Sequence, residues 1–262
     1  MHTIGKDITR FHSIIWPAML QAAELPLPRR VWAHGFVLFS GEKFSKTAGV
    51  RLELEDAIAR FGVDPLRYFL LREVPFDADG SFTWDRFEDR YNADLANAFG
   101  NLASRVVTMV EKYTDGVVPA GSRNDVDRAD ASDLTDYIAA MDGSRGYLLH
   151  EALRVVWRSV TRANEYVQRT QPWSLAKKPA ARPELEQALA LLVRQLARLA
   201  VLVSPFIPTK AQELWESLGG PGEVAGQRLG ALEGLNPTAW RVTKGPALFP
   251  REQPSAKVSS AS

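Results

Sequence analysis

The sequence predicts a mostly α-helical protein with a small α/β part at its N-terminal end. From Trp84 onward, apolar residues recur every three or four positions along three long segments, which is the pattern of packed amphipathic helices. Before that point, residues 31–40 are rich in strand-forming residues, and a polar loop bounded by glycines follows them. A chain of 262 residues with 45% apolar content can bury the cores of two domains. We therefore expect one domain over 1–83, a second over 84–250 and a disordered tail over 251–262.

Composition excludes several classes of site. The chain has no cysteine, so it holds neither a disulfide framework nor a thiolate zinc site. Its four histidines show no HExxH spacing, and we expect no protein-held metal. No apolar run approaches the roughly 20 residues that span a membrane, and no secretory signal is evident, so we expect a cytoplasmic protein. A net charge of +1 leaves any phosphate-binding surface to local clusters of Arg and Lys.

The N-terminal elements follow in order. Residues 1–8 indicate the end of a strand that runs straight into a helix, as if the chain began inside a domain. Apolar residues at helical spacing predict a helix over 9–20, which Pro26 and Pro28 end. A strand over 31–40 leads into the loop 41–49. Two short helices are expected after it, over 54–61 and 65–73, with Gly62 at the end of the first.

The second domain is expected to be a helix bundle. Residues 119–128 and 177–183 are expected to be connections, and 219–226 to follow the end of a further helix. The three apolar stripes consist of Phe87, Tyr91, Leu95, Phe99, Leu102, Val106, Met109 and Tyr113; Leu149, Leu153, Val156, Val160, Ala163 and Val167; and Leu185, Leu189, Leu192, Leu196, Leu199 and Val203.

The loop 41–49 carries two lysines three positions apart, Lys43 and Lys46. Two ammonium groups on a loop with glycine at each end can close over the negative charge that develops in phosphoryl or nucleotidyl transfer. The string is short, and taken alone it also fits a solvated surface turn.

Several strings together resemble methionyl-tRNA synthetases. They begin with GKDITRFHSIIWPAML at 5–20, WAHGF at 32–36 and KFSKT at 43–47. The resemblance continues in order through DPLRYFLLRE at 64–73, DGSF at 79–82, NADLAN at 92–97, GNLASR at 100–105, QPW at 171–173 and LFPR at 248–251. It implies a remnant of a class I Rossmann-type catalytic domain joined to a helix-bundle anticodon-binding domain.

By this resemblance, 43–47 is the second signature loop of the class, normally Lys-Met-Ser-Lys-Ser. Lys43, Ser45 and Lys46 are then the catalytic residues, and the lysines also bind ATP. Phe44 and Thr47 depart from the usual string, although Phe remains apolar and Thr keeps a hydroxyl.

The resemblance also assigns residues to the adenylate and to methionine. Gly5 and Asp7 match positions that hold the adenylate ribose, and Val37 matches one whose backbone meets the adenine. A carboxylate accepts hydrogen bonds from ribose hydroxyls, but Asp7 also fits a helix N-cap. The predicted lining of the methionine side-chain pocket is Phe11, His12 and Trp16, for which core packing is the alternative.

A second set of residues lies in the bundle. Asn97, Asn101 and Arg105 are four apart and form a polar ridge on one helix, and Asn and Arg can read base edges. Trp173 follows a proline, where an exposed indole would offer a stacking plane to an unpaired base. The resemblance implies that these residues bind the CAU anticodon; without it, the ridge fits a solvated face and Trp173 a core anchor. The arginines 145, 154, 158, 162 and 169 fit either the tRNA backbone or a solvated face.

The expected function is therefore that of a methionine-tRNA ligase, which forms methionyl-adenylate from methionine and ATP with Mg²⁺ and transfers it to tRNA. The first signature of the class, His-x-Gly-His, is missing: His2-Thr3-Ile4-Gly5 resembles it only superficially. We expect the isolated chain to be inactive without an N-terminal half, in cis or in trans. The alternative is a binding module for tRNA with a CAU anticodon. A class I synthetase for an aliphatic amino acid fits the strings less well.

Overall fold

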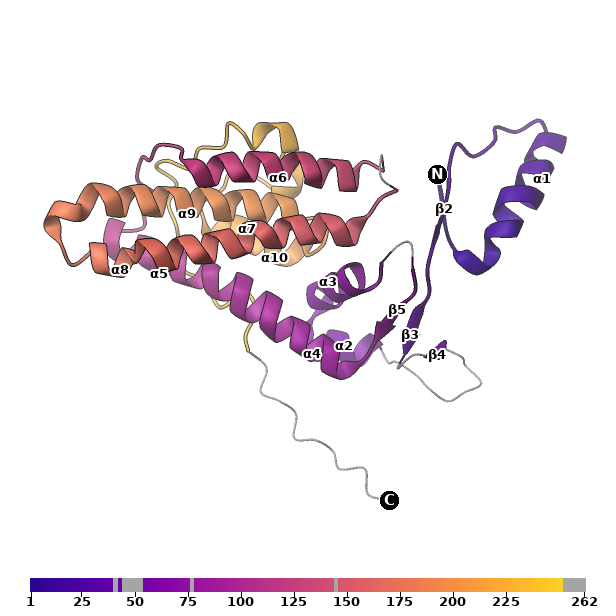
Figure 1. Ribbon diagram of the computed structural model, residues 1–262, viewed down its shortest axis with the longest axis horizontal. Coiled ribbons are helices and arrows are strands. Elements are labelled where there is room, and N and C mark those ends of the chain that lie inside the picture. The colour runs from indigo at the N-terminus through magenta and orange to yellow at the C-terminus, as the bar shows by residue number, and fades with distance from the viewer. Residues whose placement is uncertain (40–41, 44–53, 76–77, 144–145, 252–262) are drawn as a thin grey trace, which may run out of the picture. The chain divides into compact units, whose positions relative to one another are not determined.

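The computed structural model describes residues 1–39, 42–43, 54–75, 78–143 and 146–251 (Figure 1). The chain divides into two compact units. The first comprises 1–87 with 128–158, and the second comprises 88–127 with the residues from 159 onward. The domain boundary between 83 and 84 remains a prediction.

The first unit opens with a parallel pair of strands. β1 (His2–Gly5) pairs with β2 (Val31–His34). The connection passes through η1 (Lys6–Ile8), a π-helical stretch η2 (Phe11–Ile15) and α1 (Trp16–Ala22). The predicted helix over 9–20 is therefore helical but not regular, since its first turns have the wider π geometry.

The predicted strand over 31–40 is two strands. β3 (Val37–Phe39) lies in a different sheet, antiparallel to β4 (Glu42–Lys43) and parallel to β5 (Gly80–Phe82). The break falls at Gly35, where a Cβ would lie 2.0 Å from the carbonyl oxygen of Ala78. This close approach of two backbone segments requires glycine, and the sequence pattern around 35 does not indicate it.

Two helices follow the lysine loop. α2 (Leu54–Phe61) has the predicted bounds, and α3 (Val63–Glu73) begins two residues earlier than predicted. Phenylalanine rings form the core here: Phe69 lies 5.1 Å from Phe82 and 5.2 Å from Phe87, measured between ring centroids. The edge-to-face geometry of both contacts is a favourable arrangement for aromatic pairs.

A continuous helical rod begins at Trp84. It consists of α4 (Trp84–Arg90), the π-helical η3 (Tyr91–Gly100) and α5 (Asn101–Thr114), and it ends at Asp115 in the left-handed conformation. The predicted apolar stripe is buried from Phe87 to Met109, and its last residue, Tyr113, is half-buried.

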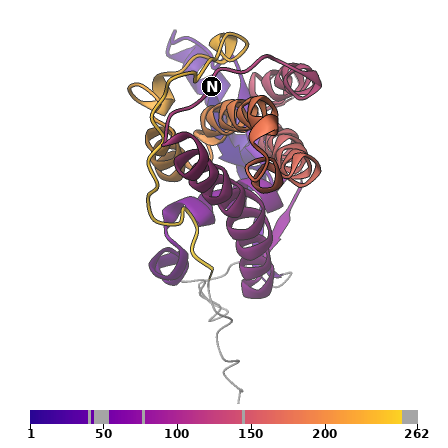
Figure 2. The same ribbon diagram turned by 90° about the vertical axis from the view of Figure 1, so that its left-hand side faces the viewer.

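The centre of the second unit is α9 (Arg182–Val203), in which every residue from Ala188 to Val203 is buried. It packs against α5, α8 (Pro172–Leu175) and α10 (Pro208–Ser217). Figure 2 views α9, in orange, nearly end-on. α9 is therefore buried on all sides from Ala188 onward, and not only along its predicted apolar stripe. The short 3-10 turns η4 (Pro179–Ala181), η5 (Val224–Gly226) and η6 (Leu229–Ala231) complete the unit.

Two further helices are α6 (Asp125–Met141) and α7 (Leu149–Thr170). α7 matches the second predicted stripe. α6 was not predicted, and it begins inside the residues 119–128 that we expected to be a connection. Its opening, DVDRADASD, is too polar to show a clear stripe.

Candidate functional site

The predicted anticodon residues Arg105 and Trp173 lie together in the second unit. The guanidinium carbon of Arg105 is 5.4 Å from the centroid of the Trp173 ring, which is cation–π distance. Gln171 turns the chain with a φ of 43°, and Pro172 is buried in the first turn of α8. These two residues hold the indole half-buried at the end of α7, with part of its surface exposed. A half-buried indole beside a guanidinium can stack on an unpaired base.

Asn97 and Asn101 lie on the same rod and are exposed. Asn101 begins α5, and Asn97 lies in the π-helical η3, where it lines a groove shared with α7. A π-helical segment is rare and often occurs at a functional site, because its wider turn redirects side chains. The opposite wall of the groove includes Gln168 and Arg169, which sequence reasoning did not assign to base recognition.

The predicted adenylate residues lie at the end of β1. Gly5 ends the strand, and Asp7 follows in η1 with its side chain exposed. A Cβ on Gly5 would lie 2.8 Å from the Asp7 carboxylate, so glycine leaves room for that group. The N-cap of η1 is Gly5, which makes no side-chain capping hydrogen bond.

Beside these residues, two hydrogen bonds to Asp79, which we call the clamp, were not predicted from the sequence. Lys6 Nζ donates to Asp79 Oδ2 at 2.7 Å, and the backbone N–H of Phe36 donates to Asp79 Oδ1 at 2.7 Å. The hydrogen bond from Lys6, followed by that from Phe36, holds the pKa of Asp79 below its usual range. The clamp joins the end of β1 to the start of β3, although Lys6 and Asp79 are far apart in sequence.

The three predicted methionine-pocket residues form an aromatic cluster with a fourth. His12 lies 5.5 Å from Phe11 and 6.1 Å from His2, and His2 lies 6.4 Å from Trp16, all measured between ring centroids. The Nδ1 of His12 is 3.1 Å from the carbonyl oxygen of Ile8, which satisfies that ring nitrogen. Phe11 is 47% exposed in this chain. No role was predicted for His2, whose string resembles the first signature only superficially.

The lysine loop is described only at its start. The backbone of Lys43 pairs with Leu38 in the antiparallel β3–β4 ladder, and Val37 pairs with Gly80 in β5. Ser45 and Lys46, with Phe44 and Thr47, lie outside the described residues, as does most of the predicted tail, 252–262.

Intramolecular contacts engage the arginines of α7. Arg154 pairs with Glu151 at 3.0 Å, and Arg158 pairs with Asp133 at 2.7 Å and Asp136 at 2.8 Å. The bond to Asp136 is the main reason why the pKa of Arg158 is raised. Arg145 lies outside the described residues.

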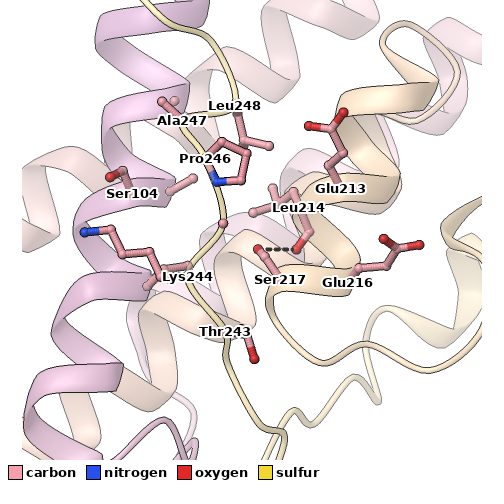
Figure 3. Close-up of a pocket in the computed structure, with 14 residues that line it drawn as sticks. Ser104, Glu213, Leu214, Glu216, Ser217, Thr243, Lys244, Pro246, Ala247 and Leu248 are labelled. Atoms are coloured by element: carbon pink, nitrogen blue, oxygen red, sulfur yellow. Dashed lines mark hydrogen bonds between the residues drawn. The ribbon is translucent and has the colours of Figure 1, made fainter.

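A separate cavity of about 360 Å³ lies between α5, α10 and the segment 243–248 (Figure 3). Ser104, Glu213 and Lys244 are among its lining residues. None of the predicted site residues lines it. Eight of its fourteen lining residues belong to η3, α5 and α10, and the other six belong to the segment 243–248.

Among the described residues, no group of three or more His, Asp or Glu side chains is arranged to hold a metal ion. In that part of the chain, no helix combines the length and the apolar content that a membrane crossing requires.

Two family models match successive parts of the chain. Residues 1–107 match the model described as "tRNA synthetases class I (M)", and 118–237 match "Anticodon binding domain of methionyl tRNA ligase". The second match covers α8 with Trp173, and the first covers η3 and the start of α5.

Individual relatives and solved structures carry the same description as the two family models. A methionine–tRNA ligase of Caldanaerobacter subterraneus is 42% identical over 96% of this chain, and one of Streptomyces coelicolor is 41% identical over 98%. The chain spans 40% and 50% of their lengths. A solved Mycobacterium tuberculosis methionyl-tRNA synthetase in complex with methionyl-adenylate matches 95% of this chain with a TM-score of 0.86 and 37% identity. The apo form of that enzyme matches with a TM-score of 0.83. The chain covers 50% of each of these solved chains.

Proposed function

The chain belongs to the methionyl-tRNA synthetase family, and from this we propose that its second unit binds tRNA with a CAU anticodon through Asn101, Arg105 and Trp173. The observation that carries the proposal is the contact between Arg105 and Trp173. An indole supplies a stacking plane, and a guanidinium beside it supplies donors for a base edge or a phosphate.

We further propose that the first unit contributes to a methionine-tRNA ligase. In this reaction methionine and ATP with Mg²⁺ give methionyl-adenylate, whose methionyl group is then transferred to tRNA in the cytoplasm. Lys43 and Lys46 would stabilise negative charge on the phosphates as pyrophosphate leaves, with Ser45 between them. Gly5, Asp7 and the backbone of Val37 would hold the adenosine, and Phe11, His12 and Trp16 would line the methionine pocket.

The order of the elements supports this assignment. The Lys6–Asp79 clamp fixes the turn that carries Asp7 relative to the strand that carries Val37. The aromatic cluster of His12 and Trp16 follows that turn directly along the chain.

We propose that this chain does not form methionyl-adenylate by itself. β1 and β2 form a two-stranded parallel sheet, whereas parallel sheets are normally covered on both faces. The exposed large apolar side chains are concentrated at this end of the described chain, namely Met1, Ile8, Phe11, Ile14, Ile15, Met19, Leu25 and Leu27. A concentration of exposed apolar side chains of this kind marks a surface that packs against another part of a protein. The remaining part of a full-length synthetase, in cis or in trans, is the cover we propose, since the relatives are at least twice as long.

A pyrophosphate-exchange assay tests the last proposal. The purified chain should show no methionine-dependent exchange above the rate without methionine. Exchange that depends on both methionine and the chain would overturn it.

Competition binding tests the anticodon proposal. A labelled RNA hairpin with a CAU loop is bound by the chain and displaced by unlabelled hairpins whose anticodon letters are changed one at a time. Each changed letter should compete less well than CAU, by about tenfold for a lost pair of hydrogen bonds to a base. Equal competition by all hairpins would remove the proposal. A chain that is inactive in exchange yet selective for CAU corresponds to the second candidate function, a binding module without catalysis.

A further inference from the structure

The string LFPR at 248–251 has no role in the proposed function. It ends the segment 240–251, which we call the strap and which passes between α5 and α10 in Figure 3. The first end of the strap is anchored by backbone hydrogen bonds. The N–H of Val242 donates to the carbonyl oxygen of Gly116, and that of Thr243 donates to the carbonyl oxygen of Ser217, both at 2.8 Å.

The other end of the strap is anchored on η3. Phe249 is 4% exposed, and its ring lies 6.2 Å from that of Tyr91 and 6.4 Å from that of Phe99, measured between centroids. The hydroxyl of Tyr91 donates to the carbonyl oxygen of Pro250 at 2.6 Å. Tyr91 is the first residue of η3 and Phe99 is the last but one, so the strap contacts both ends of the π-helical stretch.

Gly100 makes room for this contact. It lies inside a continuous helical rod, where glycine is less favourable than alanine. A Cβ on Gly100 would lie 2.9 Å from the carbonyl oxygen of Leu95 and 3.5 Å from a ring carbon of Phe249. Leu95 is five residues earlier, which is the separation of hydrogen-bonded residues in a π-helix. Glycine therefore accommodates both the π turn and the strap.

The ten residues of η3 are long for a π-helix, which mostly occurs as a single turn. Tyr91, Leu95 and Phe99 are four apart, and all three are buried. At 3.6 residues per turn, a spacing of four moves each side chain about 40° farther around an α-helix. The wider π turn reduces this advance and keeps the three side chains on one face. Phe249 packs against the first and the last of them.

We propose that Phe249 is a positioning residue for tRNA recognition. Together with Gly100 it holds η3 in its π-helical form, and this form sets the angle of Asn97 relative to Asn101 and Arg105. The inference rests on the proposed anticodon function, but it concerns a residue that does not itself contact RNA.

The geometry of a helix gives the size of the effect. Relaxation of one π turn to α geometry changes the register of the rod by one residue, which is about 100° of rotation. α5 is held by its packing against α9, so the residues of η3 turn, and Asn97 turns with them. A side chain at about 5 Å from the helix axis then moves by about 8 Å.

Spin labels measure this rotation without RNA. The chain has no cysteine, so Ala93→Cys on η3 and Glu184→Cys on α9 introduce two exposed labelling sites. The distance between the labels is measured by double electron–electron resonance in the full chain. Phe249→Ala and Gly100→Ala should each shift that distance, by up to about 8 Å. A reference pair at the exposed Lys112 and Thr161, on α5 and α7, should keep its distance in both variants.

RNA binding measures the consequence. Dissociation constants are compared by fluorescence anisotropy for a CAU hairpin and for hairpins with one changed anticodon letter. Phe249→Ala should reduce the discrimination at one letter by about tenfold, which is the contribution of a pair of hydrogen bonds to a base. Phe249→Tyr keeps the ring and should restore both the discrimination and the label distance.

Two further variants separate positioning from a general loss of packing. Val242→Ala truncates another buried residue of the strap, 3% exposed, at the end away from η3. It should keep the discrimination and the label distance. Tyr91→Phe removes only the bond to Pro250 and should shift the label distance in the same direction as Phe249→Ala, by less. It provides the test if circular dichroism melts show that Phe249→Ala is unfolded.

Two results overturn the inference while the anticodon proposal stands. One is an unchanged distance between the labels at 93 and 184 in Phe249→Ala, Gly100→Ala and Tyr91→Phe. The other is an equal loss of discrimination in Val242→Ala, because loosening of the whole strap would then explain the effect. If the wild-type chain binds the CAU hairpin no better than one with a changed anticodon, the proposed function fails, and the positioning role fails with it.

Discussion

Removing the indole of Trp173 should weaken the binding of a CAU hairpin by a predictable amount. Stacking of one base on an aromatic side chain contributes about 1–3 kcal/mol, so Trp173→Ala should raise the dissociation constant by about 5- to 150-fold. Trp173→Phe keeps a smaller ring, so its dissociation constant should lie between those of the wild-type chain and Trp173→Ala. Since Trp173 is only half-buried, Trp173→Ala should leave most of the fold intact.

The contact between Arg105 and Trp173 also predicts that the two side chains are energetically coupled in RNA binding. The guanidinium lies 5.4 Å from the indole, so each side chain helps to position the other. A cation–π contact at such a site contributes about 0.5–1 kcal/mol. Arg105→Ala should therefore weaken binding, and the double variant should lose less binding free energy than the sum of the two single losses, by at least that amount.

The assay is isothermal titration of the hairpin into each variant. Lys112→Ala is the matched control, because Lys112 is an exposed cation on the same helix that also lies over a ring, 5.6 Å from that of Tyr113. It should bind RNA as the wild-type chain does. Losses that add within about 0.5 kcal/mol would refute the coupling, and an unchanged affinity for Trp173→Ala would refute the site.

Three further predictions concern the framework of the two units. Asp127→Ala leaves Arg194 buried without its carboxylate, whose two oxygens it contacts at 3.0 Å, and should lower the free energy of unfolding in urea by about 3–5 kcal/mol. Gly35→Ala places a Cβ against the backbone of Ala78 and should cost about 1–3 kcal/mol in the same measurement; an unchanged unfolding midpoint would contradict the close approach. The pKa of Asp79 is lowered in the fold, so the stabilisation by its bond to Lys6 is present above about pH 4 and is lost as the pH falls through the folded pKa. Asp79→Asn should therefore reduce the acid sensitivity of thermal unfolding, and an identical pH profile would contradict it.

Periodicity predicted the long helices well, because burial of one helix face imposes a repeat on the sequence. The stripe from Phe87 to Met109 and the bounds of α2 follow from that repeat. α6 was not predicted, because its first turns are too polar to show an apolar stripe. The break between β2 and β3 was not visible either, since it depends on the contact of Gly35 with Ala78, far along the chain.

In the candidate site, too, features with a local sequence pattern were predicted, and contacts between distant residues were not. Trp173 and Arg105 were chosen from family strings and a proline turn, and they lie in contact. The clamp of Lys6 and Asp79 joins residues that no local pattern connects. Gln168 carries no sequence signal at all, since an exposed glutamine on a helix is ordinary until its neighbours in space are known.

The most direct test of the account is to ask which part of the chain touches the anticodon. An RNA hairpin with 5-iodocytidine at the C of CAU, or 5-iodouridine at the U, is bound to the chain and irradiated, and the crosslinked peptide is identified by mass spectrometry. The account predicts a crosslink to the tryptic peptide over 170–177, which contains Trp173, and its loss in Trp173→Ala. A crosslink that maps to the first unit, or one that persists in Trp173→Ala, would contradict it.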